Sequence, residues 1–110
     1  MKKNNIEADI SFRFLSLDKF QAYSLVREIL GSTHEEHSEH KCYIACVPLT
    51  QQNFEEINDY FVRQRIEIAA CDILVSVSSD SKSGYVDVPQ IVNRMLKYID
   101  CKLTFSFTAA

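Results

Sequence analysis

The residues of this chain that could do chemistry gather in one short polar stretch, residues 32–40. All three histidines fall there and a cysteine follows at once, giving the spacing His-x2-His-x2-His-x-Cys over His34, His37, His40 and Cys42. Imidazole nitrogen and thiolate sulfur are the usual ligands of zinc. A spacing of three suits one turn of helix, so a helical conformation would bring His34 and His37 together, and His40 less well. The stretch is therefore a candidate zinc site.

The alternative is a solvated polar loop that contacts a partner. Its acids, Glu35, Glu36 and Glu39, make it strongly polar, and ordering a flexible loop around a metal costs about 1 kcal/mol or more per residue. Cys42 is unavailable if the strand that follows turns it into the core. We therefore rank a contact surface first and a metal site formed by His34, His37 and His40 second. Because imidazoles titrate near neutrality, a pH-dependent contact is a further alternative.

Enzymatic activity has little support in the sequence. Cys42 and His40 are the one candidate nucleophile and base, but they are two residues apart in a strand-like segment. The adjacent acids Glu55 and Glu56 point about 100° apart on a helix, which favours a solvated face over paired catalytic carboxylates. Two glycines in the whole chain exclude a phosphate-binding loop of the Walker or dinucleotide type. We expect a protein that is not an enzyme and needs no cofactor.

Composition indicates one soluble domain over residues 1–110. The chain is 46% hydrophobic and 25% charged, with a formal net charge of −3, and its bases are scattered, so no patch for nucleic acid is expected. No apolar run approaches the roughly 18 residues of a membrane helix. Acids at Glu7 and Asp9 interrupt the place where a signal peptide would be apolar. We expect a cytoplasmic protein whose four cysteines are reduced.

Hydrophobic periodicity predicts the elements. Alternation of apolar and polar residues predicts strands over 7–14, 71–78 and 101–108, and a segment apolar on both parities predicts a central strand over 41–47. Helical spacing predicts helices after Asp18, after Thr50 and over 88–99. Asp18 and Gln21 have the spacing of a capping box, and Gly31 is suited to end the first helix.

This order, β-α-β-α-β-α-β, predicts an α+β two-layer sandwich, with three helices on one face of a four-stranded sheet. Three of the four strands alternate, so the second face of the sheet should be open to solvent. Tyr43, Leu74, Thr104 and Ser106 are expected to form a mixed platform on that open face. Such a platform suits a protein partner or a second copy of the chain in a homodimer, and the alternative is a face that merely meets solvent.

The layout resembles a small bacterial family of domains of unknown function, number 4279. The matching pieces are the strand over 10–14, the Leu30-Gly31 helix end, the helix over 54–61, the strand over 73–77 and the segment 91–107. The resemblance spans most of the chain and consists of patterns rather than signature residues. It implies the same α+β fold and carries no catalytic residues.

In size and character the chain is also similar to the immunity proteins encoded beside bacterial toxins, including those of contact-dependent growth inhibition and other toxin–antitoxin pairs. That resemblance implies a protein that occludes a cognate toxin. An acidic surface would suit a basic toxin domain through electrostatic steering, without contacts to nucleic acid or membrane. The acids expected to bind lie in the histidine stretch and on the second helix: Glu35, Glu36, Glu39, Glu55, Glu56 and Asp59.

Overall fold

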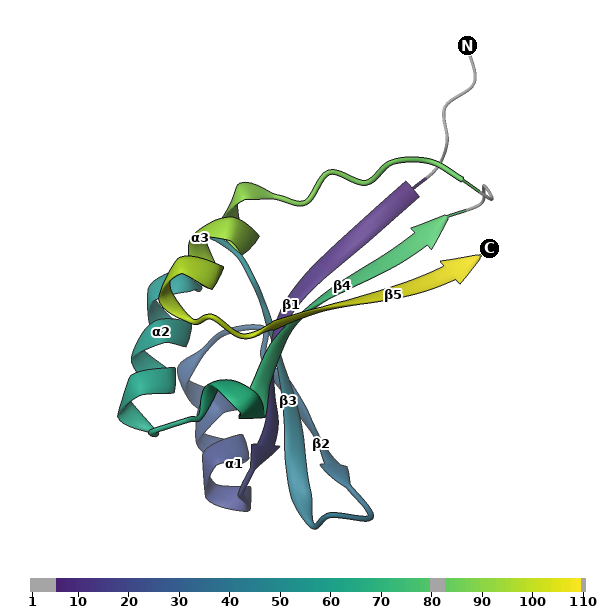
Figure 1. Cartoon of the computed structure of the whole chain (residues 1–110). Coiled ribbons are helices and arrows are strands. Elements are labelled where there is room, and N and C mark those ends of the chain that lie inside the picture. Colours follow the sequence, from purple (N-terminus) through teal and green to yellow (C-terminus); the bar gives the residue numbers. More distant parts are fainter. Residues whose placement is uncertain (1–5, 80–82, 110) are drawn as a thin grey trace.

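The computed structural model describes residues 6–79 and 83–109 (Figure 1). The elements follow one another as β1 (Ile6–Leu17), α1 (Lys19–Glu28), β2 (Thr33–His37), β3 (Cys42–Pro48), α2 (Phe54–Arg63), the 3-10 turn η1 (Ile68–Ala70), β4 (Cys71–Ser79), α3 (Gln90–Tyr98) and β5 (Lys102–Ala109). None of the helices within these described ranges is long and apolar enough to cross a membrane.

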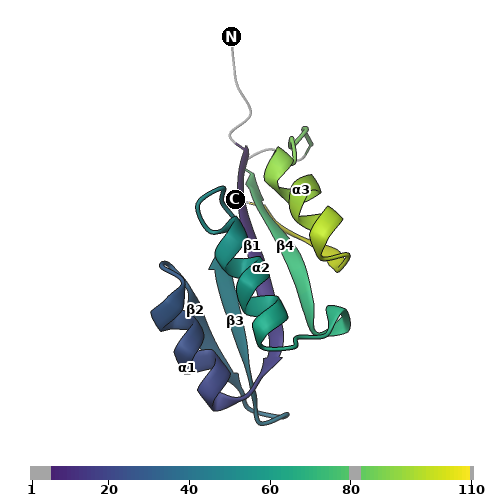
Figure 2. The same cartoon turned by 90° about the vertical axis from the view of Figure 1, so that its left-hand side faces the viewer.

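The strands form one mixed sheet in the order β2-β3-β1-β4-β5. β1 is antiparallel to both of its neighbours, β2 is antiparallel to β3, and β5 is parallel to β4, to which it connects through α3. All three helices lie against one face of the sheet (Figures 1 and 2). The expected α+β class is confirmed.

Two details of the expected sheet are wrong. The sheet has five strands instead of four, because the histidine stretch forms β2. β1 is the central strand, whereas β3, which was expected at the centre, is second from the edge. β3 is nevertheless apolar on both parities. Ala45 and Val47 are buried on the helix side, and Ile44 and Cys46 are half-buried on the open side.

The core lies between the sheet and the helices, on the alternating positions of the strands. Phe12 and Phe14 of β1 are fully buried there, with their rings edge-on at 5.1 Å. The ring of Tyr60 on α2 stands 5.1 Å from that of Phe14, also edge-on, and its hydroxyl donates a 2.7 Å hydrogen bond to the carbonyl of Gln21. This bond gives the polar tip of a buried tyrosine a partner and joins α2 to α1.

The start of α1 follows from the sequence as expected, but its end does not, because the helix stops at Glu28 with Ile29 as its C-cap, two residues before Gly31. The carboxylate of Asp18 accepts from the backbone N–H of Gln21, and the side-chain oxygen of Gln21 accepts from the backbone N–H of Asp18, at 2.8 and 2.9 Å. This is a complete capping box. Beyond the helix, Gly31 has φ +87°, a conformation that glycine adopts without steric cost.

The face of the sheet opposite the helices carries an ion pair at its centre. Arg13 of β1 and Asp72 of β4 are cross-strand partners, and the guanidinium donates two hydrogen bonds to the carboxylate, at 2.8 and 2.6 Å. The hydroxyl of Thr104 on β5 donates a third bond to Asp72, at 2.8 Å. These three polar side chains tie three neighbouring strands together.

Candidate protein-binding surface

The hairpin formed by β2 and β3 separates the histidines. In a strand, successive side chains point to opposite faces, so His34, which pairs with Ala45, faces the helices, and His37, which pairs with Cys42, faces the open side. The expectation that a helical turn would gather the histidines is therefore wrong. Only the rings of His37 and His40 approach one another, with their centroids 4.6 Å apart.

The remaining ligand of the expected zinc site lies on the open side of the sheet. Cys42 is half-buried, opposite His37, and its thiol donates a long contact of 3.8 Å to the carbonyl of Leu15. It does not point into the core between sheet and helices. Among the residues described here, no group of three or more His, Cys, Asp or Glu side chains is placed to hold a metal ion.

His34 instead belongs to an aromatic cluster between the hairpin and α1. Its ring stacks on Tyr23 of α1, with centroids 5.1 Å apart and planes 21° from parallel, and meets Tyr43 of β3 edge-on at 5.5 Å. Tyr43 thus faces the helices, and the expectation that it lies on the open face with Leu74 is wrong. Burial and the nearby carboxylate of Glu36 both raise the pKa of Tyr43.

The outer side of α1 presents the side chains that most resemble a binding site. The inner stripe of Ala22 and Leu25 packs into the core, and this places Phe20, Tyr23 and Arg27 outside. The Phe20 side chain is 86% exposed and that of Tyr23 is 43% exposed. Aromatic residues and arginine are enriched at protein interfaces and among the residues that contribute most to binding.

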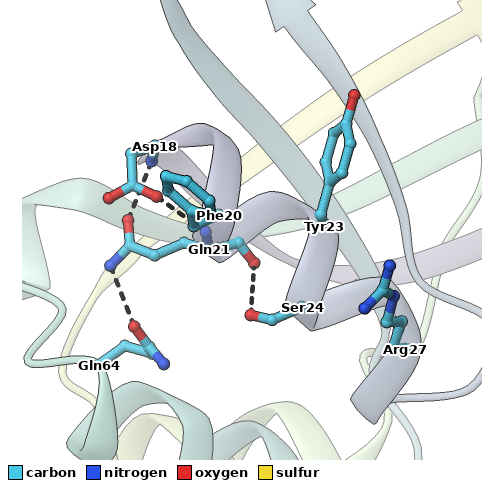
Figure 3. Close-up of a pocket in the computed structure, with 7 residues that line it drawn as sticks. All are labelled: Asp18, Phe20, Gln21, Tyr23, Ser24, Arg27 and Gln64. Carbon is cyan, nitrogen blue, oxygen red and sulfur yellow. Dashed lines mark hydrogen bonds between the residues drawn. The ribbon is translucent and has the colours of Figure 1, made fainter.

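These outer side chains line a hollow of about 600 Å³ on the surface of α1 (Figure 3). In Figure 3, Tyr23 and Arg27 project from one side of the helix, while Gln21 points toward Gln64 at the end of α2, with a long hydrogen bond of 3.4 Å between their amides. The hollow is open and shallow, so it suits the side chains of a protein partner better than an enclosed small molecule.

The six acids expected to bind a partner are all exposed. Three of them share one face of α2, because Asp59 lies three residues after Glu56 and four after Glu55. Arg63, one turn further on, pairs with Asp59 at 3.4 Å and with Glu28 of α1 at 2.5 Å. This short chain of charges links the outer faces of α1 and α2.

The hairpin acids are split between the two faces of the sheet. Glu36 pairs with Tyr43 and faces the helices, whereas Glu35 pairs with Ile44 and faces the open side. Glu39 lies in the turn that joins β2 to β3. Figure 2 shows α1 in front of β2, with α2 beside it on the same side of the sheet. A single partner seated on the helices can therefore reach Glu36 and the acids of α2, but not Glu35.

We call five neighbouring residues the α1 surface: Phe20, Tyr23 and Arg27 of α1, together with His34 and Glu36 of β2. Sequence reasoning identified His34 and Glu36 but not the three residues of the helix. A signal for them was present, since Phe20, Tyr23 and Arg27 repeat at helical spacing on the side opposite the core stripe. Two exposed aromatic residues in that register are what distinguishes this face from an ordinary charged one.

Comparison of the chain with protein-family profiles, with curated proteins and with solved structures gave no match.

Proposed function

We propose that this chain is a protein-binding domain without enzymatic activity, and that it acts in the bacterial cytoplasm as an immunity protein that neutralises a cognate toxin by direct binding. The observation that carries the proposal is the α1 surface. It places two exposed aromatic rings and an arginine around an open hollow, next to a histidine and an acid from β2.

The helix that presents this surface is held rigidly. Its first turn is closed by the capping box, the hydroxyl of Tyr60 binds the carbonyl of Gln21, and Glu28 pairs with Arg63. The ring of Tyr23 is in turn held by stacking on His34. A surface that is already ordered loses little conformational entropy on binding, which supports the tight and specific occlusion that an immunity protein needs.

The charge beside the α1 surface favours a basic partner. Glu36 lies on β2 and faces the helices. Glu55, Glu56 and Asp59 lie on α2, the helix beside α1 (Figure 2). The chain as a whole has a formal charge of −3. Acidic groups around an aromatic centre accelerate the encounter with a basic toxin and make the association rate sensitive to salt.

Co-purification with the product of the gene directly upstream tests this function. The chain should form a complex with a Kd well below about 1 µM, and Phe20→Ala or Tyr23→Ala should weaken it at least about 30-fold, as expected for residues worth about 2 kcal/mol each. Tyr85→Ala is the matched control, because that ring is 96% exposed and lies outside the α1 surface. A complex weaker than micromolar, or one unaffected by both α1 variants, would refute the proposal.

Charge reversal at two neighbouring residues tests the placement of the partner. Glu36→Lys should slow association at low salt about tenfold, because this residue faces the helices, whereas Glu35→Lys should change the rate little, because it faces the open side. Both variants alter the net charge equally, so each controls for the other. Stopped-flow association at several salt concentrations measures the difference, and equal slowing by both would show that the partner does not sit on the helix side.

A further inference from the structure

We propose that the edge strand β5 is a homodimer interface, in which a second copy of this chain pairs its own β5 antiparallel and continues the sheet. Within residues 6–79 and 83–109, β5 is the last strand of the sheet and pairs with β4 alone. The backbone groups on its outer side are therefore available to another strand. This surface is at the opposite edge of the sheet from the hairpin and α1, so pairing would leave the proposed toxin-binding surface free.

The two edges of the sheet differ in a way that points to β5. β2, at the other edge, has five residues. Its three central residues are His34, Glu35 and Glu36, and polar and charged side chains of this kind discourage the addition of another strand. β5 has eight residues and carries no charge after Lys102. It also has no proline and keeps an unbroken register with β4 from end to end. The features that protect exposed edges are missing from it.

The apolar side of β5 is exposed where the strand leaves the helices. Phe105 and Phe107 face the helix side, in register with Val75 and Val77 of β4, yet their side chains are 59% and 60% exposed. Figure 1 shows the C-terminal part of β5 extending past the helices. Two large apolar rings on an unpaired edge form the kind of patch that marks an interaction site.

The sequence of β5 indicates that the missing neighbour is β5 itself. Residues 104–108 are Thr-Phe-Ser-Phe-Thr, which is the same in both directions. Antiparallel pairing about a two-fold axis at Ser106 therefore places Phe105 opposite Phe107 of the second copy, and Thr104 opposite Thr108. Every cross-strand pair is then matched in size and polarity, as an isologous interface requires. Lys102 lies outside this paired segment.

The area available is enough for a modest dimer. A phenylalanine buries about 150–250 Å² when fully covered, so four rings, each about 60% exposed, contribute at most about 360–600 Å². The paired backbones add to this, and the total is at the low end of specific interfaces. We expect a dissociation constant in the micromolar range, on the order of 10 µM.

Sedimentation equilibrium of the full chain tests the proposal through charge complementation at the two-fold axis. Wild type should dimerise with a dissociation constant on the order of 10 µM. Ser106→Lys and Ser106→Glu should each weaken self-association at least about tenfold, since like charges then face one another, and an equimolar mixture of the two should recover dimers. Ser78→Lys is the matched control, because Ser78 is exposed on the same sheet face of the neighbouring strand β4.

Recovery of dimers in the mixture, with Ser78→Lys unchanged, would support pairing through Ser106. Wild type that stays monomeric at about 1 mM would overturn the proposal and leave this edge to a strand of a different protein. Dimers that persist equally in both Ser106 variants would also overturn it, because the contact must then lie elsewhere on the molecule.

Discussion

The ion pair on the open face gives the sharpest prediction about stability. The side chain of Asp72 is 3% exposed and that of Arg13 is 24% exposed, and the carboxylate accepts two bonds from Arg13 and one from Thr104. Arg13→Ala removes the hydrogen-bonded counter-charge and leaves the buried carboxylate with the neutral donor Thr104 and the charge of Lys102. Loss of one member of a buried pair costs about 3–5 kcal/mol, a large part of the roughly 5–15 kcal/mol by which domains are stable.

Replacing both members should cost far less. In Arg13→Met with Asp72→Leu, no charge is left unpaired and apolar side chains fill similar volumes, so the free energy of unfolding should remain within about 1 kcal/mol of wild type. For a domain of this size, 1 kcal/mol corresponds to about 4 °C in Tm. Arg13→Ala should therefore lower Tm by about 12–20 °C, and the double variant by about 4 °C at most.

The same pair sets a dependence on pH. Burial by itself would raise the pKa of Asp72, but the hydrogen bonds from Arg13 and Thr104 and the charge of Arg13 outweigh it, so the pKa of this carboxyl is lowered. A lowered folded-state pKa contributes stability above the ordinary value of about 4, and that contribution is lost as the pH falls below it.

Urea denaturation followed by circular dichroism at pH 7 and pH 3 measures these effects. Wild type should lose more stability between the two conditions than the double variant, which lacks the titrating carboxyl. The reasoning is refuted if Arg13→Ala costs less than about 1 kcal/mol, or if the double variant is as unstable as the single one.

Three further outcomes follow from individual contacts. Tyr60→Phe, which leaves the carbonyl of Gln21 without its 2.7 Å donor, should cost about 1–2 kcal/mol in urea denaturation, and an unchanged midpoint would contradict this role. Gly31→Ala should lower Tm by about 4–8 °C, because φ is +87° and the added Cβ would lie 3.3 Å from Cγ of Pro48; no change would show that the turn relaxes freely. A thiol reagent should modify the half-buried Cys42 and Cys46 first, and the buried Cys71 and Cys101 only after unfolding. Equal rates of modification at all four cysteines would contradict this difference in burial.

Local patterns were sufficient for most of the fold. The capping box of Asp18 and Gln21 located the start of α1, and alternation located β1, β4 and β5. Each of these signals is local, because it depends on residues only a few positions apart in the sequence. The capping box marks a helix start, and alternation marks a strand with one buried face.

The strand β2 was missed for a physical reason. An edge strand outside the main core needs no alternation of apolar residues, and Thr33–His37 has none. The turn that follows also lacks the glycine or asparagine that usually marks a hairpin turn in a sequence. Its left-handed position is occupied by Lys41, with φ +52°. Without that strand, Glu35 and Glu36 could not be placed on opposite faces of the sheet.

Contacts between distant residues were beyond sequence reasoning. Arg13 and Asp72 are 59 residues apart, and both occupy positions that alternation assigns to the solvent side. Only the strand order brings them together at the centre of the sheet, where their neighbours bury the carboxylate. The same order places His34 beside Tyr23 instead of beside His37.

The α1 surface combines a rigid support with side chains that the fold itself does not need. Phe20 is 86% exposed, so removing its ring should change the free energy of unfolding by no more than about 0.5 kcal/mol. A large apolar ring exposed to water lowers the solubility of the isolated domain and adds nothing to its stability. Covering the ring in a complex removes apolar surface from water, which favours binding. The proposed function thus assigns stability and recognition to different faces of the same helix, and Phe20→Ala should reduce affinity for the partner while leaving the unfolding transition in place.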